Sequence, residues 1–274
     1  MVKEKKPKDK SKKKKKKAGH KKKPKAHAQP EPFDCAGFTN TDPPRVFRSL
    51  SDFWAAFPAE GWYPSGASYW DKVTCDDSGM LGGLLELKEP DERSSLALLH
   101  ELQERGTGKK RACDVGGGIG RVTQNVLLKC FESVDLVEQC PAFLERAARD
   151  MPDVGRICCG LQQFAPPEAA YDAVWVQWVT GHLRDEDFVP FVERAIKGLA
   201  PGGVLVVKDN TSSGDELVMD LQDHSVTRSL KHYTELFRRA AATARVVSCT
   251  RQEGFPPAVF PVYTWVLQKA TPKE

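Results

Sequence analysis

The sequence predicts an α/β domain, preceded by a helical cap and a lysine-rich N-terminal tail. Three observations carry this prediction: apolar segments alternate with helical ones from residue 111 onward, a glycine cluster follows the first apolar segment, and the charge changes sharply along the chain. Alternating strands and helices are typical of a parallel sheet with crossover helices. A chain of 274 residues suffices for one such domain with an attachment.

The predicted tail spans residues 1–45. Residues 1–25 contain fifteen lysines and two acidic residues, a net charge of +13; since the whole chain carries +4, residues 26–274 carry −9. With almost nothing apolar before Phe33, the tail cannot offset its ordering entropy, and we expect it to be disordered. Its lysine runs favour contact with an import receptor or nucleic acid, with a solvated arm as the alternative. The negative net charge of residues 26–274 favours cationic partners.

The predicted domain occupies residues 46–274. Helical periodicity and clustered aromatic residues over 46–108 predict the cap, and residues 109–274 form the sheet region. The last two strands have no helix between them and should pair antiparallel at the sheet edge. Strands are expected over residues 111–115, 134–137, 156–159, 172–177, 203–207, 245–250 and 262–268, and helices over 119–131, 141–149, 185–199 and 226–242.

Several classes of protein are disfavoured by what the chain contains. Its eight cysteines form no C-x-x-C pair and have no histidine at ligand spacing, so neither a metal site nor a disulfide framework is expected. The lysine-rich N-terminus has no apolar segment behind it, and no apolar run approaches the length of a membrane span. We therefore expect an intracellular protein, cytoplasmic and nuclear, with no membrane partner.

The glycine cluster, D-V-G-G-G-I-G-R over residues 114–121, lies where a strand becomes a helix. Glycines allow a tight turn and close approach of a ligand, and the helix N-terminus offers free N–H groups. The spacing fits neither the dinucleotide fingerprint G-x-G-x-x-G nor a Walker loop. It resembles motif I of class I methyltransferases, and Glu138 at the end of the second strand could accept the ribose hydroxyls of an adenosine. The alternative is a plain tight turn.

Four further segments, over residues 158–162, 175–182, 208–210 and 220–223, closely resemble the α-N-terminal protein methyltransferase family. The resemblance covers residues 69–267. It implies a seven-stranded class I methyltransferase fold that uses S-adenosylmethionine to methylate N-termini beginning X-Pro-Lys or X-Pro-Arg. Glu138 departs from the pattern, since the family commonly has aspartate there.

The resemblance also implies roles for individual residues. It places the peptide against Tyr69, Trp70, Trp178, Asp220 and Tyr263. It assigns the chemistry to Asn210, Asp223 and His182. It places the cofactor against Gly116, Gly118, Arg121, Glu138, Gly160, Leu161, Gln162 and Gln177.

The chemistry agrees with these roles. An α-amino group has a pKa near 8, against about 10.4 for lysine, so little help is needed to expose its lone pair. Asn210 can orient the amine and Asp223 can accept its proton, with His182 as a second candidate base. Alternatively, Asp220 and Asp223 cap a helix that starts near residue 225, and His182 is structural. Two other functions stay open: a methyltransferase of the same fold acting on a small molecule or a lysine, and a non-catalytic protein bound to RNA or ribosomes.

Overall fold

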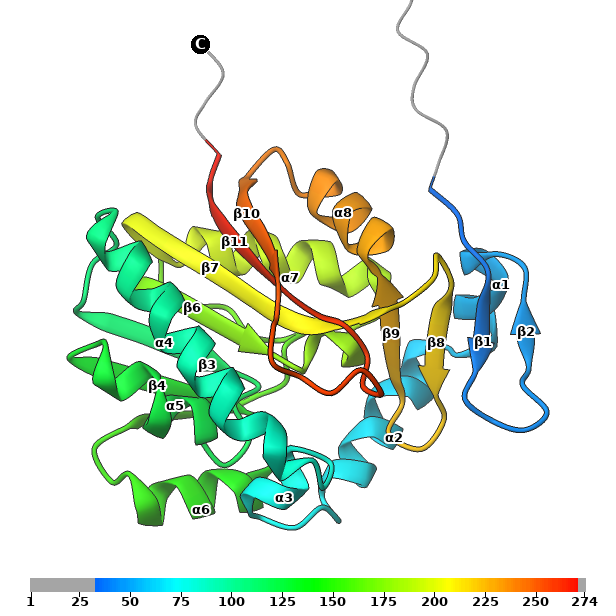
Figure 1. The fold of residues 1–274 in the computed structure, drawn as a ribbon, viewed down its shortest axis with the longest axis horizontal. Helices are drawn as coiled ribbons and strands as arrows, with labels where there is room; N and C mark the ends of the chain where they lie inside the picture. Colours follow the sequence, from blue (N-terminus) through cyan, green and yellow to red (C-terminus); the bar gives the residue numbers. More distant parts are fainter. Residues whose placement is uncertain (1–32, 271–274) are drawn as a thin grey trace, which may run out of the picture. The chain divides into compact units, whose positions relative to one another are not determined.

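A computed structural model describes residues 33–270 of this protein, and residues 1–32 of the predicted tail lie outside the described part. Its centre is a sheet of seven strands in the order β5-β4-β3-β6-β7-β11-β10, parallel except for β11, which runs antiparallel to both its neighbours (Figure 1). The predicted seven-stranded sheet and its antiparallel last pair are confirmed. The strands are β3 (Arg111–Val115), β4 (Ser133–Glu138), β5 (Gly155–Cys158), β6 (Tyr171–Gln177), β7 (Leu199–Ser212), β10 (Ala244–Arg251) and β11 (Val262–Lys269).

Helices cover both faces of this sheet. On one face lie α4 (Lys88–Glu104), α5 (Arg121–Asn125) and α6 (Pro141–Asp150), and on the other α7 (Asp185–Lys197) and α8 (Leu230–Arg239) (Figure 1). Leu99 and Leu102 of α4 pack with Ala112 and Val126 in one core cluster. Thus α4 belongs to the layer over the sheet, whereas the sequence assigned it to the cap.

A smaller sheet in the order β2-β1-β8-β9 extends the end of β7 and was not predicted. Its strands are β1 (Gly37–Thr39), β2 (Val46–Phe47), β8 (Leu217–Asp220) and β9 (Ser225–Ser229). The helices α1 (Leu50–Ala56) and α2 (Ala59–Trp70) cover it, and Phe53 and Trp62 pack on Leu217 and Met219.

The position of β1 corrects the predicted end of the tail. Gly37 to Thr39 pair in parallel with Leu217 to Met219, so the ordered chain begins well before residue 45. A Cβ atom at Gly37 would lie 3.1 Å from the Phe53 ring and 3.2 Å from Leu217 Cβ, which explains why glycine stands there. Three residues were too few for a strand signal, and the pairing depends on a partner far along the chain.

Two predicted helices need correction. The helix expected over 119–131 consists of α5 followed by a 3₁₀ turn at Leu127–Lys129. The helix expected over 226–242 starts only at Leu230, where Ser229 accepts a hydrogen bond from the His232 amide. Residues 225–229 form β9 instead, with residues 225–227 paired to β8 and residues 228–229 to β7. The suggested helix-capping role of Asp220 and Asp223 is therefore wrong.

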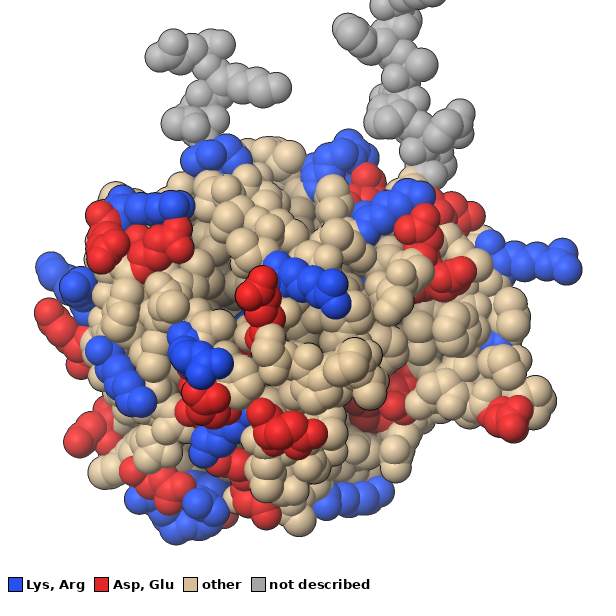
Figure 2. Space-filling view, in the orientation of Figure 1, with Lys and Arg blue, Asp and Glu red and all other residues tan. Residues whose placement is uncertain are grey.

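Charged side chains are spread over the surface. On the face shown in Figure 2, acidic and basic side chains are interspersed and form no single acidic patch. The net charge of −9 over residues 26–274 thus does not by itself locate a cationic partner. Among residues 33–270, no helix combines the length and the apolar character needed to cross a membrane.

Candidate active site

A pocket opens at the carboxyl ends of β3, β4 and β6, where ligand sites of parallel sheets lie. Its walls come from α2, the glycine loop, the segments after β4, β5 and β6, and the turn between β8 and β9. All eight residues predicted to contact the cofactor line this pocket, and so do Trp70, Trp178 and His182. The remaining five predicted residues lie outside its lining: Tyr69, Asn210, Asp220, Asp223 and Tyr263.

The glycine loop forms the floor of the pocket. Gly116, Gly118 and Gly120 all have positive φ angles (71°, 59° and 85°), which favour glycine. A Cβ atom at Gly118 would lie 2.5 Å from the sulfur of Met80, which also lines the pocket. The positive φ angles therefore favour glycine at all three positions. At Gly118 a side chain would in addition collide with Met80 in the pocket.

Glu138 is fixed against this loop. One of its carboxylate oxygens accepts the amide N–H of Gly118 at 3.0 Å and the other accepts that of Cys140 at 2.8 Å. Burial raises the pKa of Glu138. Each oxygen keeps a further lone pair, so the side chain can still accept the two hydroxyls of a ribose.

The loop after β5 is held by hydrogen bonds from a single arginine on α7. Arg194 of α7 donates to the carbonyl oxygens of Leu161 at 3.1 Å, Gln162 at 3.0 Å and Phe164 at 2.8 Å. This clamp fixes the backbone of the predicted Gly160–Gln162 segment, although no local sequence signal pointed to Arg194.

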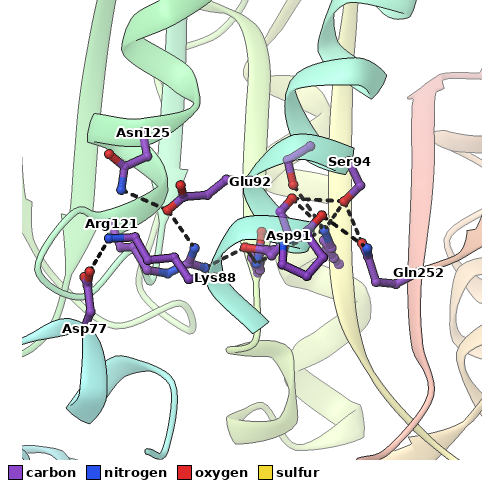
Figure 3. Close-up of polar contacts among 12 residues, drawn as sticks. Asp77, Lys88, Asp91, Glu92, Ser94, Arg121, Asn125 and Gln252 are labelled. Atoms are coloured by element: carbon purple, nitrogen blue, oxygen red, sulfur yellow. Dashed lines mark hydrogen bonds and ion pairs between the residues drawn. The ribbon is translucent and has the colours of Figure 1, made fainter. Parts of the chain in front are cut away.

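A buried ionic cluster fixes two more of the predicted cofactor residues (Figure 3). The fully buried carboxylate of Asp91 accepts from Gln177 Nε2 at 2.9 Å, and it pairs with Arg121 Nη2 at 2.8 Å and Lys208 Nζ at 2.5 Å. The Nη1 atom of Arg121 lies 3.6 Å from the Glu92 carboxylate but makes no hydrogen bond in the described residues, and Arg121 lines the pocket. Asp91 was missed because a charged residue on a helix resembles a solvated face.

His182 lies at the other end of the pocket. Its Nε2 atom accepts from the indole N–H of Trp70 at 3.1 Å, and its Nδ1 atom lies 3.3 Å from the carbonyl oxygen of His224. The two contacts together specify a neutral ring protonated at Nδ1. In this arrangement the lone pair of His182 is already used by Trp70. His224 also lines the pocket, although no motif or spacing pointed to it.

Trp178 has an unusual backbone. Its φ of 53° is rare outside glycine and typical of strained functional positions. Its indole nitrogen is buried and has no hydrogen-bond partner within residues 33–270, and the Arg121 guanidinium lies 5.4 Å from its ring centre. Such an unpaired donor in a pocket wall is available to a ligand.

Asp223, Asp220 and Tyr69 lie beside the pocket. Burial raises the pKa of Asp223, and one carboxylate oxygen is buried with no hydrogen-bond partner among the described residues. Burial, and then the charges of Asp223 and Asp220, raise the pKa of Tyr69. Tyr69 also lines an open groove on α2 together with Gln222. These three predicted residues therefore form one acidic, aromatic cluster.

Asn210 and Tyr263 lie on the paired strands β7 and β11. Asn210 pairs with Val262, whereas Tyr263 pairs with Asp209, so the two side chains alternate to opposite faces of the sheet. The structure brings neither of them into the pocket lining, and their contact with a peptide stays a prediction.

Comparison with known proteins decides the family. The model of the AdoMet-dependent proline dimethyltransferase family matches residues 58–268. This chain belongs to that family. It is 43% identical over 216 residues to alpha N-terminal protein methyltransferase 1 of Drosophila melanogaster (76% of each chain), and 36% identical over 214 residues to N-terminal Xaa-Pro-Lys N-methyltransferase 1-B of Xenopus laevis (75% of this chain, 95% of the relative). A solved SAM-dependent methyltransferase of Leishmania major superposes with a TM-score of 0.81 at 32% identity, covering 89% of this chain and all of its own.

As a member of this AdoMet-dependent family, the protein uses S-adenosylmethionine. The pocket fits that cofactor in two respects. The Nη1 atom of Arg121, which makes no hydrogen bond in the described residues, suits the carboxylate of its methionine part, and Glu138 suits its ribose. The predicted family, fold and cofactor are thus confirmed, while the roles of individual residues stay predictions.

Proposed function

We propose that this protein transfers a methyl group from S-adenosylmethionine to the α-amino group of protein N-termini that begin X-Pro-Lys or X-Pro-Arg. The bound cofactor supplies an electrophilic methyl group. The observation that carries the proposal is the arrangement at one end of the cofactor pocket, where Trp70, Trp178 and His182 line the wall beside the half-buried Asp223. Relatives named for methylation of Xaa-Pro-Lys N-termini support it.

Asp223 is the best-placed base in this arrangement. A protonated α-amino group must lose its proton before it attacks, and a half-buried carboxylate with a raised pKa accepts that proton more readily than an exposed one. His182 is the second candidate, but its Nε2 lone pair accepts from Trp70. Asn210 would orient the amine, and the remaining rate comes from holding the nitrogen in line with the methyl group.

Recognition of the peptide follows from the same cluster. The flat faces of Tyr69, Trp70 and Trp178 suit a proline ring and cationic groups. Asp220 would pair with the lysine or arginine at position three, and Tyr263 would contact the peptide from β11. The free α-amino group is thereby distinguished from a lysine side chain by the proline beside it.

Methylation of matched peptides tests the proposal. An X-Pro-Lys peptide should be methylated at its N-terminus, and the same peptide with an N-acetyl block should not react. Reaction of the blocked peptide would place the acceptor on lysine and contradict the proposal. Binding of S-adenosylmethionine in calorimetry without turnover of either peptide would favour the small-molecule or the non-catalytic alternative.

We also propose that the lysine-rich tail directs the protein to the nucleus as well as the cytoplasm, through an import receptor or nucleic acid. The support is its net charge of +13 over residues 1–25. A full-length chain should accumulate in nuclei more than a chain lacking residues 1–32. In vitro, RNA binding by the full-length chain should weaken steeply with salt. Equal distribution of both chains and no salt-sensitive binding would leave only the solubilising role.

A further inference from the structure

Thr180, in the 3₁₀ turn Thr180–His182 after β6, is the centre of a buried polar network. Its amide and its hydroxyl both donate to Asp209 Oδ2, at 2.9 and 2.6 Å. The hydroxyl oxygen also lies 2.9 Å from the Tyr233 hydroxyl. Because the single hydroxyl proton of threonine goes to the carboxylate, Tyr233 is the donor in this last contact. Every polar group of the side chain is therefore fixed.

Arg228 of β9 joins this turn to the smaller sheet. Its fully buried guanidinium donates to the carbonyl oxygens of Thr180, at 3.0 Å, and Leu183, and to the carboxylate of Asp185 at 2.9 Å. Burial alone would raise the pKa of Asp185, but the Arg228 charge and His232 hold it well below its usual range. The ion pair is therefore intact at neutral pH.

The network reaches a third element through Asp209 of β7. Its Oδ1 atom accepts the amide N–H of Asn210 at 2.8 Å, while Oδ2 accepts from Thr180. Three elements thus meet at one buried point: β7 with Asn210, the turn with His182, and the β8–β9 hairpin with Asp223. No hydrogen bond joins these three side chains to the network in the described residues.

We propose that the network of Thr180, Asp209, Arg228 and Tyr233 positions the acceptor side of the active site. This inference rests on the proposed function. The four residues are positioning residues, because they touch neither the pocket nor the reacting atoms. They set the placement of the β8–β9 hairpin relative to the turn that carries His182. An in-line methyl transfer needs that placement, since a misplacement of about 1 Å can cost about 100-fold in rate.

The test compares Thr180→Val, which keeps the shape and removes the hydroxyl, with Thr180→Ser, which keeps the hydroxyl. Thr180→Val should lower kcat on an X-Pro-Lys peptide by about 10- to 100-fold, with the Kd for S-adenosylmethionine changed less than about twofold. Thr180→Ser should restore most of the turnover. Tyr233→Phe, which removes one bond of the same network, should give a smaller loss.

Tyr171→Phe is the matched control. The Tyr171 hydroxyl donates to Asp135 at 2.7 Å and is equally buried, but it lies at the amino end of β6, opposite the pocket. Its removal should lower the Tm about as much as Tyr233→Phe and leave kcat unchanged. Full turnover by Thr180→Val, or an equal loss of kcat in Tyr171→Phe, would overturn the inference.

Hydrogen exchange separates this inference from the proposed function. In Thr180→Val, amides in residues 178–184 and 217–229 should both exchange faster, whatever the substrate is, and neither segment should change in Tyr171→Phe. Faster exchange in the first segment alone would contradict the coupling. A wild-type protein that binds the cofactor but leaves the peptide unmethylated would instead contradict the proposed function.

Discussion

The two ends of the pocket are built in different ways. At the cofactor end, Gly116, Gly118 and Glu138 come from two consecutive strand–loop–helix units, and all eight predicted residues line the pocket. At the acceptor end, the side chains come from α2, the turn after β6 and the β8–β9 hairpin, and several predicted residues lie beside the lining. A cofactor site of this kind is specified locally, whereas the acceptor site depends on how distant segments are held together.

The largest effect that would test this contrast comes from Asp223→Asn at the acceptor end. If the carboxylate takes the proton, kcat should fall by about 10²–10⁴-fold with an unchanged Kd for S-adenosylmethionine. The raised pKa of Asp223 means that stability is lost as the pH rises through its folded pKa, so the ionised group destabilises the fold at neutral pH. The variant should therefore show a higher Tm at pH 7.5 and no gain near pH 3.

Asp220→Asn is the control for that variant, and it should raise the peptide KM more than it lowers kcat. Near-wild-type turnover by Asp223→Asn would show that Asp223 is not the base. His182 would then be the remaining candidate, and the proposed role of the β8–β9 hairpin at the acceptor end would be wrong.

An intermediate effect is expected at the cofactor end from Gly118→Ala. The added methyl group meets the sulfur of Met80 at 2.5 Å, and crowding of this kind costs about 1–3 kcal/mol. Cofactor affinity should fall by roughly 10- to 100-fold in calorimetry. Gly82→Ala is the control, because Gly82 has nearly the same φ (58°) but open space around its Cβ position. Equal losses in both variants would show that backbone strain, not the pocket, is responsible.

The smallest effect concerns the N-terminal segment. Deleting residues 1–39 removes β1, its pairing with β8, and Phe33, whose ring centre lies 5.0 Å from that of His232. A loss on the order of 2 kcal/mol is expected, which corresponds to about 4–8 °C in Tm. Deleting residues 1–32 should leave the Tm and peptide turnover nearly unchanged. A large loss of turnover in the shorter deletion would mean that the tail takes part in the active site.

The sequence predicted the elements of the cofactor end of the pocket better than those of the acceptor end. The glycine loop, β3 and α6 were located within a residue or so, because each is set by neighbours in the chain. Most of β9 was taken as the start of a helix, because Val226 lies at helical spacing from later apolar residues and its strand partner Met219 is visible only in the fold.

Within the site, Asp91 and Arg228 could not be found from the sequence for a similar reason. Both are charged residues that the fold buries completely, and each is stabilised by partners on other elements. Periodicity assigns such residues to the surface. By contrast, Trp175 lies between Val174 and Val176 in β6, a pattern typical of a buried strand, and it is fully buried.

The junction between the two sheets is narrow. Within residues 33–270, the two sheets share strand pairing only where Thr211 and Ser212 at the end of β7 meet Arg228 and Ser229 of β9. The smaller sheet is otherwise attached through side chains, such as Trp62, whose indole donates to the carbonyl oxygen of His182. A different small sheet in this place would change what is methylated and leave the glycine loop and Glu138 as they are, provided that it again presents an arginine to the turn after β6 and an aromatic wall to the pocket.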